Sequence, residues 1–562
     1  MKTQWWHKSI IYQIYPKSFY DANHDGIGDL EGIIAKLDYL QDLGIDVIWL
    51  SPVYQSPMAD NGYDISDYYA IAKEFGTMSQ MEQLLKEAKQ RNIRIIMDLV
   101  VNHTSDEHGW FLESKSSRTN PKRNWYIWRD PKPDGSPPNN WGSVFGGSAW
   151  EYDSLTAQYY LHVFSKKQPD LNWENPEVRE AIYKMIHWWL NKGISGFRVD
   201  AITYIKKDQS FASILSITDG DLPLVSGASL NQPGIEKFLA ELKFEAFNDE
   251  LITVAEAPGV SFDDLSKYAG ENGYFSMIFS FDHVDWDLGN GGKWYKYHPD
   301  TEWFLNLKRV IRRDQNYYNQ TGWNAIFLEN HDSPRSLNKF IKHDDISVLS
   351  AKMLAIFYFL LRGTPFIYQG EEIGMTNVAY PSIKDYDDIS SLDQYQAAIR
   401  DGYSQQDAMK AVWRRSRDNA RTPMQWNDQY QAGFSDCTPW LKVNPNYQSI
   451  NVERCRQDPR SLLYFYKKLI WLRKESSYSD VLTYGEYQAL WEEDPDIFGY
   501  LRLNQRKKLL VMGNFHGFPR KVNIPFIVTQ MVLSNYTDFC HESILRPYEA
   551  MVLELAVDKE IQ

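Results

Sequence analysis

Short apolar stretches rich in β-branched residues alternate with amphipathic helical stretches along most of this chain. One helical stretch, residues 78–91, places on a single face the apolar residues Met81, Leu84, Leu85 and Ala88. Strands are expected at residues 10–16, 46–52, 94–103, 196–201, 251–256, 275–282, 324–330 and 364–370. This alternation predicts an α/β fold with a parallel sheet, and the number of strands favours a closed (β/α)8 TIM barrel over an open sheet.

Three regions depart from the alternation. Residues 104–172 are polar, proline-rich and aromatic, and they are too long for a plain loop, so we expect an inserted B domain there. The barrel domain A would then comprise residues 1–103 and 173–480, with an irregular subdomain at 375–460. From residue 481 to 562, short alternating runs predict a C-terminal antiparallel β domain.

Composition and charge narrow the class of protein. The chain has 562 residues, 43% of them hydrophobic, which is typical of a globular protein with a large core. Its formal net charge of -14 argues against binding nucleic acid. We expect no membrane partner, because no run of 18 apolar residues and no signal-peptide pattern is found.

The three cysteines are widely spaced and form no zinc or redox motif, so we expect reduced, buried thiols at Cys437, Cys455 and Cys540. These features together predict a cytoplasmic enzyme, and we expect it to be a monomer.

Acidic and histidine side chains stand at the ends of four expected strands, where a β/α barrel carries its functional groups. They are Asp98 with His103, Asp200 with Arg198, Glu256, and His331 with Asp332. A single acid at such a position is more often a solvated cap or an ion-pair partner. Four such strand ends at one rim are harder to explain structurally, because buried like charges are costly.

Several carboxylates around one cleft suit hydrolysis of a glycosidic bond, which needs a protonated acid and an ionised nucleophile. Side chains two apart on a strand share a face, so Arg198 would keep Asp200 ionised. Glu256 follows the apolar run LITVA, where desolvation would raise its pKa. We therefore assign Asp200 as nucleophile and Glu256 as acid/base, about 5–5.5 Å apart if the enzyme retains configuration.

Ordered motifs strengthen this interpretation. DLVVNH (98–103), GFRVDA (196–201), AEAPG (255–259) and ENHDSPR (329–335) resemble the four signature regions of the α-amylase superfamily, glycoside hydrolase family 13. QPDLNW (168–173) and GTPFIYQGEE (363–372) resemble its further signatures. KSIIYQIYPKSFYDANHDGIGD (8–29) and SRDNARTPMQW (416–426) are similar to the oligo-1,6-glucosidase and α-glucosidase group. The likeness spans residues 5–550.

The resemblance implies a (β/α)8 barrel with a B domain after the third strand and a C-terminal β-sandwich. It implies a retaining mechanism through a covalent glucosyl-enzyme intermediate, with no organic cofactor. Asp332 would be the third carboxylate, which stabilises the transition state. His103 and His331 would bind hydroxyls of the glucose, and Arg198 would orient Asp200.

The same resemblance implies a closed pocket that admits one terminal glucose of a small oligosaccharide. Asp60 and Tyr63 match residues that close the non-reducing-end subsite, with Tyr63 as a stacking platform. Arg417 matches an arginine that pairs with Asp60. Phe145, Phe164 and Gln168 would line the cleft, although plain B-domain packing is the alternative for each.

The segment DANHDGIGD has oxygen donors at alternating positions, as a calcium loop does. The expected ligands are Asp21, Asn23, Asp25, the carbonyl of Ile27, and Asp29. Position 12 of the loop is Gly32 rather than glutamate, so the loop is not a complete EF-hand. The resemblance implies one structural Ca²⁺ or Mg²⁺ ion, and the alternative is a metal-free turn.

Ala201 follows the expected nucleophile. In this group a valine at that position accompanies α-1,6 specificity, so the smaller alanine predicts an exo-α-glucosidase active on α-1,6 and α-1,4 linkages. The difference in bulk between valine and alanine corresponds to roughly 1–3 kcal/mol of discrimination between substrates.

Three alternatives stay open. Lys206 and Lys207 supply basic groups that could bind the phosphate of trehalose 6-phosphate, so a trehalose-6-phosphate hydrolase is an alternative. The stretch HVDWD (283–287) lacks the charged pattern of sucrose isomerases, but sucrose hydrolysis is an alternative. A non-catalytic sugar-binding relative would be expected to lack one of the three carboxylates.

Overall fold

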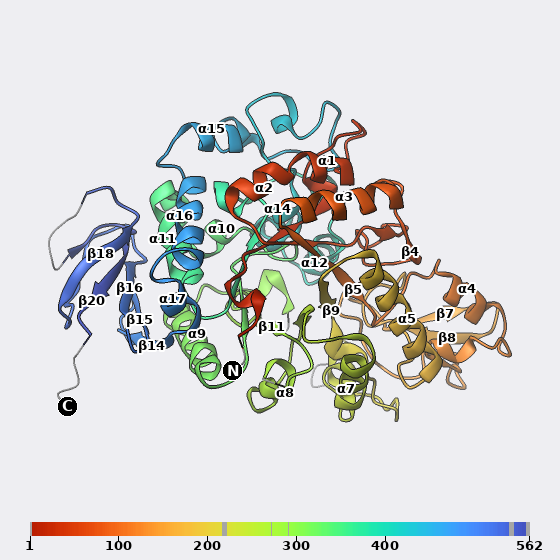
Figure 1. Cartoon of the computed structure of the whole chain (residues 1–562). Coiled ribbons are helices and arrows are strands. Elements are labelled where there is room, and N and C mark those ends of the chain that lie inside the picture. The colour runs from red at the N-terminus through yellow and green to blue at the C-terminus, as the bar shows by residue number, and fades with distance from the viewer. Residues whose placement is uncertain (1–2, 216–221, 271, 290–291, 539–543, 558–562) are drawn as a thin grey trace. The chain divides into compact units, whose positions relative to one another are not determined.

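The eight expected strands are all present and close into a parallel barrel in the order β1-β13-β12-β11-β10-β9-β5-β2. Figure 1 shows two neighbouring strands of this barrel, β5 and β9. The TIM barrel is therefore confirmed. The computed structural model describes residues 3–215, 222–270, 272–289, 292–538 and 544–557. The barrel strands are β1 (Ile11–Ile14), β2 (Val47–Leu50), β5 (Arg94–Val100), β9 (Gly196–Asp200), β10 (Ile252–Glu256), β11 (Met277–Phe279), β12 (Asn324–Ile326) and β13 (Thr364–Tyr368).

Each strand is shorter than the apolar stretch that predicted it. The stretch 94–103 yields β5, which ends at Val100, so His103 lies in the loop that follows. The stretch 324–330 yields β12, which ends at Ile326. The polar ends of these stretches are therefore loop residues beyond the carboxyl ends of the strands, where barrel enzymes place their chemistry.

Helices follow the strands as the alternation predicts. The helix expected at 78–91 is α3 (Met78–Gln90), whose N-cap Thr77 forms a capping box with Gln80. The others before β13 are α1 (Leu30–Ala35), α2 (Leu37–Leu43), α4 (Gly109–Ser116), α5 (Pro176–Lys192), α6 (Ser226–Ser229), α7 (Ile235–Ala246), α8 (Leu265–Ala269), α9 (Trp303–Gln320), α10 (Ser336–Phe340) and α11 (Val348–Phe359).

Residues 375–460 are more regular than the sequence suggested. They contain four α-helices, α12 (Ile389–Arg400), α13 (Gln405–Arg415), α14 (Asp418–Arg421) and α15 (Val452–Gln457). The apolar periodicity was weak because α12 buries only the small residues Ser391 and Ala398, and because α14 and α15 have 4 and 6 residues. Two further helices, α16 (Leu462–Lys474) and α17 (Ser479–Tyr484), come before the C-terminal strands.

The chain forms two compact units by its internal contacts. The first comprises residues 1–28, 35–48 and 281–562, and the second comprises residues 29–34 and 49–280. The second contains the stretch expected as a B domain, with a three-stranded antiparallel sheet of β6 (Trp128–Arg129), β8 (Gln158–Leu161) and β7 (Trp150–Asp153). It also holds the small pair β3 (Tyr54–Gln55) and β4 (Asp67–Ile71). The domain boundaries at 103, 172 and 480 stay predictions.

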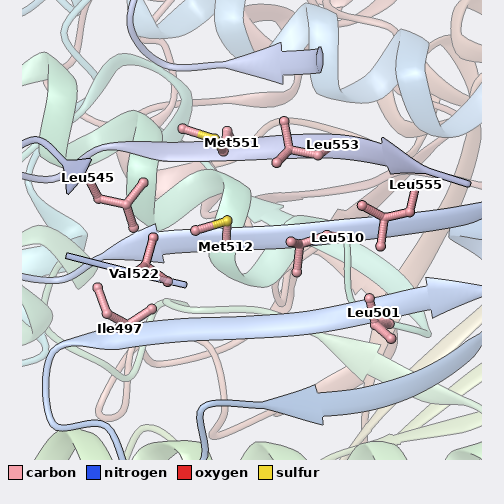
Figure 2. Packing of buried hydrophobic residues seen from close by; sticks show 9 residues of the cluster. All are labelled: Ile497, Leu501, Leu510, Met512, Val522, Leu545, Met551, Leu553 and Leu555. Atoms are coloured by element: carbon pink, nitrogen blue, oxygen red, sulfur yellow. The ribbon is translucent and has the colours of Figure 1, made fainter. Parts of the chain in front are cut away.

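The C-terminal part of the first unit is antiparallel, as expected. A five-stranded sheet comprises β14 (Glu486–Leu490), β15 (Ile497–Leu503), β16 (Lys508–Asn514), β20 (Ala550–Leu555) and β18 (Val528–Ser534), and a short pair comprises β17 (Arg520–Lys521) and β19 (Ile544–Leu545). Figure 2 shows its core, in which alternate residues such as Leu510 and Met512 share one face. Val522 and Leu545 pack against that face, so apolar burial joins the two sheets.

The two cysteines that the structure describes differ in their exposure. Cys437 is exposed, so the expectation of a buried thiol is wrong there, while Cys455 is partly buried. Cys540 lies outside the described residues. Within the described ranges, no helix combines the length and the apolar character needed to cross a bilayer.

Candidate active site

Arg198 is the centre of a charged cluster at the carboxyl ends of three neighbouring strands of the second unit. Its Nη1 donates to Asp98 Oδ1 at 2.5 Å and to Asp200 Oδ1 at 2.7 Å. Its Nη2 lies 2.9 Å from Glu256 Oε2. A single planar guanidinium thus bridges the expected nucleophile, the expected acid/base and a third carboxylate, which a point charge such as lysine could not do.

Asp98 is fully buried beneath this cluster. Its Oδ2 accepts from Trp49 Nε1 at 2.8 Å and from the Tyr63 hydroxyl at 3.4 Å. Burial raises the pKa of Asp98 to about 6, although Arg198 acts in the opposite direction. Asp98 therefore holds Arg198 from within the barrel, whereas Asp200 and Glu256 are partly accessible.

His103 and Gln168 form a second polar group in the same unit. Gln168 Nε2 lies 3.1 Å from His103 Nε2 and donates to Asp60 Oδ2, also at 3.1 Å. The His103 ring contacts the carbonyl of Tyr63 at 3.2 Å. Burial lowers the pKa of His103 to about 4, so the imidazole is neutral at pH 7 and suited to hydrogen bonding with sugar hydroxyls.

The aromatic residues expected to line the cleft lie beside His103. Phe164 packs against His103 with ring centroids 5.4 Å apart, and Phe145 packs against Phe164 at 5.6 Å. Tyr204 also packs against Phe164, with ring centroids 5.4 Å apart. The second unit thus brings together every substrate residue predicted within it, while the sugar contacts themselves stay predictions.

Ala201 adopts an unusual backbone conformation for a residue with a side chain. Its φ is 42° and its ψ is 33°, in the left-handed region, and it is buried. Its N–H donates to Glu256 Oε2 at 3.1 Å. The small side chain is therefore favoured by the turn itself, because β-branched residues are strained at positive φ.

Both lysines considered as phosphate ligands are already engaged by oxygen atoms. Lys207 is buried, and its Nζ lies 2.8 Å from Asp170 Oδ2 and 2.7 Å from Asn102 Oδ1. Lys206 Nζ lies 2.5 Å from Glu174 Oε1. Lys207 is thus a structural cation beneath the loop of His103, a role the sequence did not reveal.

We expect Lys207→Met to lower the free energy of unfolding by about 3–5 kcal/mol, because it leaves the buried Asp170 carboxylate without its cation. Lys206→Met is the matched control, since its partner Glu174 is partly exposed, and it should cost less than about 1 kcal/mol. Denaturant unfolding of both variants measures the difference. Equal, small losses in the two variants would contradict the structural role of Lys207.

Asp332 stands six residues beyond the end of β12, in the first unit. Its Oδ1 accepts from Arg421 Nη2 at 2.7 Å and from Arg417 Nη1 at 3.3 Å, and its Oδ2 lies 3.1 Å from His331 Nε2. The two guanidiniums hold the Asp332 carboxyl group in place, which suits a group that stabilises positive charge on a sugar ring.

His331 and Arg417 are held by further partners in the same unit. The buried His331 ring contacts Gln13 Nε2 through Nδ1 at 2.8 Å. Arg417 Nε donates to Asp388 Oδ1 at 2.7 Å. Burial alone would raise the pKa of Asp388, but Arg417 and Arg421 hold it below its ordinary range. The expected pair of Arg417 with Asp60 stays a prediction.

Sequence reasoning missed three residues around Asp332 and His331. Arg421 lies in the quoted segment SRDNARTPMQW, yet only Arg417 was singled out from it. Gln13 lies within β1 and Tyr15 directly follows that strand, and Tyr15 stacks on His331 with ring centroids 6.0 Å apart. The polar Gln13 inside a fully buried strand was the available signal.

The side-chain oxygens of the acidic loop at residues 21–29 accept hydrogen bonds, most of them from backbone N–H groups of the same loop. Asp21 Oδ2 accepts from Gly26 N at 2.8 Å and from the Ser435 hydroxyl at 2.5 Å, and Asp25 Oδ1 accepts from Ile27 N at 2.9 Å. Asn23 Oδ1 accepts from Asp25 N at 3.0 Å.

Within the described part of the chain, no group of three or more His, Cys, Asp or Glu side chains is placed to hold an ion. The expected ligand set of the loop, which also includes Asn23 and the carbonyl of Ile27, therefore stays a prediction. In this structure the side-chain oxygens of Asp21 and Asp25 accept hydrogen bonds from N–H and hydroxyl donors of the chain.

Known proteins are similar to this chain over almost all of its length. The model of the α-amylase catalytic domain matches residues 13–485. The oligo-1,6-glucosidase of Bacillus cereus is 48% identical to the chain over 567 aligned residues, which cover 99% of this chain and 100% of that protein.

Solved structures are similar over the same length. The trehalose-6-phosphate hydrolase of Bacillus licheniformis has a TM-score of 0.90 at 44% identity, and the isomaltulose synthase of Protaminobacter rubrum has a TM-score of 0.93 at 38% identity. Each covers 99% of this chain and 100% of the compared chain.

The chain therefore belongs to the α-amylase family, and it is a glycoside hydrolase. Within that family it falls in the oligo-1,6-glucosidase group.

Proposed function

We propose that this enzyme is an exo-acting, retaining α-glucosidase that releases glucose from the non-reducing ends of short isomalto- and malto-oligosaccharides. The observation that carries the proposal is the contact of one guanidinium, that of Arg198, with both Asp200 and Glu256. Asp200 would attack the anomeric carbon while Glu256 protonates the departing oxygen. Water then hydrolyses the glucosyl ester with Glu256 as base.

Asp332 is proposed as the third carboxylate, which stabilises the oxocarbenium-like transition state. It follows β12, and parallel barrel strands present their carboxyl ends at one rim. His103 and His331 would hydrogen-bond the hydroxyls of the bound glucose. Asp60 and Tyr63 would close the pocket behind that glucose, so that only terminal residues are removed.

The engagement of Lys206 and Lys207 by carboxylates favours an unphosphorylated substrate over trehalose 6-phosphate. The small side chain of Ala201 favours use of both α-1,6 and α-1,4 linkages. Sucrose hydrolysis follows from the same pocket only if the cleft also accepts fructose.

Glucose release from isomaltose, maltose, sucrose and trehalose 6-phosphate at equal concentration tests this proposal. Comparable kcat/KM on isomaltose and maltose, with the α-anomer of glucose formed first by NMR, is the expected result. Trehalose 6-phosphate as the preferred substrate, or first release of the β-anomer, would contradict it. Release from isomaltose alone would show that residues other than Ala201 set the linkage.

We also propose, from the family resemblance, that the loop at residues 21–29 binds one structural Ca²⁺, or Mg²⁺ in its place. Asp21, Asn23, Asp25, Asp29 and the carbonyl of Ile27 would hold it through oxygen atoms, which are the ligands that Ca²⁺ prefers. A ligand at a hundred times its Kd stabilises the folded state by about 2.7 kcal/mol.

We therefore expect Ca²⁺ to raise the Tm of the chelator-treated enzyme, and Asp25→Asn to abolish that rise while leaving the Tm in chelator unchanged. An identical Tm with and without Ca²⁺ would count against the ion and leave the metal-free turn.

The enzyme is further proposed to act as a monomer in the cytoplasm. The exposed thiol of Cys437 supports a reducing compartment. Light scattering should give the mass of one chain, 65.8 kDa.

A further inference from the structure

The turn after β9 contains a strained residue, Ala201, for which the proposed mechanism gives no role to the backbone. Ala201 has a left-handed backbone conformation, which costs on the order of 1 kcal/mol or more for a residue other than glycine. Such strain tends to persist at functional sites when the surrounding structure requires it. The residue lies directly after the expected nucleophile, Asp200.

The consequence of this conformation is the direction of one N–H group. The Ala201 N–H donates to Glu256 Oε2 at 3.1 Å, and Arg198 Nη2 lies 2.9 Å from the same oxygen. Two donors from β9 and its following turn thus converge on one oxygen of a side chain on β10. The pairing of β9 with β10 fixes the backbone between them, with Val199 opposite Ala255.

We propose that the backbone N–H of Ala201 is a positioning group for the acid/base Glu256. Together with Arg198 it holds Oε2 as an acceptor, so that the proton passed to the leaving oxygen is carried on Oε1. This inference rests on the proposed function, in which Glu256 is the acid/base. Residue 201 then acts on catalysis through its backbone as well as through the bulk of its side chain.

Glu256 transfers a proton through Oε1 in both steps of the retaining reaction. As the bond between the anomeric carbon and the leaving oxygen breaks, that oxygen takes the proton from Glu256 Oε1, and an Asp200 oxygen forms the new bond to the anomeric carbon. In the second step water loses a proton to Oε1 and displaces Asp200. Oε2 keeps its two donors throughout.

Other ionisable groups also face Glu256 and set the background for any pH effect. Arg198, Asp98 and Asp200 belong to the same cluster. Tyr204, on the turn after Ala201, has its pKa raised to about 12 by burial and by the Glu256 charge, so it stays neutral in the working range. Removal of the Ala201 N–H leaves all four in place.

The sharpest test replaces the amide between Asp200 and Ala201 with an ester in the full-length enzyme, which removes the N–H and keeps every side chain. Substituted phenyl α-glucosides of equal size and graded leaving-group acidity report on acid catalysis. We expect kcat/KM to fall by about tenfold or more on the least acidic phenol and by less than about threefold on the most acidic. The high-pH limb of kcat/KM should move to higher pH, because an N–H donor favours the ionised carboxylate.

Two side-chain variants separate this effect from bulk in the cleft. Ala201→Gly keeps the N–H and accepts the left-handed turn, so any loss should be equal across the phenol series. Ala201→Val strains the turn, and a loss that grows with leaving-group basicity would again support the positioning role. An equal loss across the series in both the ester and Ala201→Val would overturn the inference.

Glu256→Gln, measured on the same phenol series, distinguishes failure of the inference from failure of the proposed function. If Glu256→Gln shows no leaving-group dependence, Glu256 is not the acid/base and the proposed function fails. If the loss in Glu256→Gln depends on the leaving group and the loss in the ester does not, only the positioning role of Ala201 is overturned.

Discussion

Replacing Asp200 with asparagine is expected to lower kcat for isomaltose by on the order of 10⁴-fold or more, which is the usual loss when a covalent nucleophile is removed. The amide has the shape of the carboxylate but does not form the glucosyl ester. Because Asp98 and Glu256 still neutralise Arg198, the fold should be retained. Steady-state rates and a melting curve of the same sample measure the two effects.

Asp263→Asn is the control, because Asp263 is exposed on a short helical turn outside the cluster and should leave kcat unchanged. A loss of less than about tenfold in Asp200→Asn would contradict its role as nucleophile. A large loss together with a collapsed melting curve would instead assign Asp200 a structural role.

Replacing Arg198 with methionine is expected to have the second largest effect, on stability as well as activity. The change leaves Asp98, Asp200 and Glu256 close together without their shared cation. Loss of one partner of a buried ion pair costs about 3–5 kcal/mol, and here three carboxylates share the partner. Activity should fall by on the order of 10³-fold or more, since both reacting carboxylates lose their positions.

The stability of Arg198→Met should depend on pH with a definite sign. Burial already raises the pKa of Asp98 to about 6, and removal of the cation raises it further. A carboxyl with a raised pKa in the folded state stabilises the fold at low pH, and that contribution is lost as pH rises. Denaturant unfolding should therefore show a larger deficit at pH 8 than at pH 5.

Two further arginine variants serve as comparisons. Arg198→Lys should recover part of the stability but little of the activity, because an ammonium does not bridge three carboxylates in one plane. Arg179→Met removes a buried arginine on α5 that pairs with Glu241, and it should reduce stability without changing kcat on surviving enzyme. A pH-independent deficit in Arg198→Met would contradict the shared-cation account.

The barrel could be predicted from the sequence because its signal is repeated. Eight apolar stretches gave eight strands, and only their ends were misplaced. The spacing of Arg198 and Asp200 on one strand also implied their contact, since period-two geometry is local. Glu256 was expected in an apolar setting, yet its carboxylate contacts Arg198.

The remaining site features depend on contacts that no local pattern encodes. Arg421 reaches Asp332 across 89 positions of sequence, and Lys207 reaches Asn102 across 105. The left-handed turn at Ala201 also has no sequence signal, because this conformation is usually marked by glycine, asparagine or aspartate rather than by alanine. These features depend on how the loops pack together, whereas the strands follow from the local periodicity of apolar residues.

We propose that Asp200 forms the covalent bond to glucose. Incubation with 5-fluoro-α-glucosyl fluoride, which slows the second step, followed by mass spectrometry of proteolytic peptides, tests it most directly. We expect one fluoroglucosyl adduct on the peptide that contains Asp200, and none on the Asp200→Asn variant. An adduct on Glu256 or Asp332, or an inactivated enzyme that carries no adduct, would contradict it.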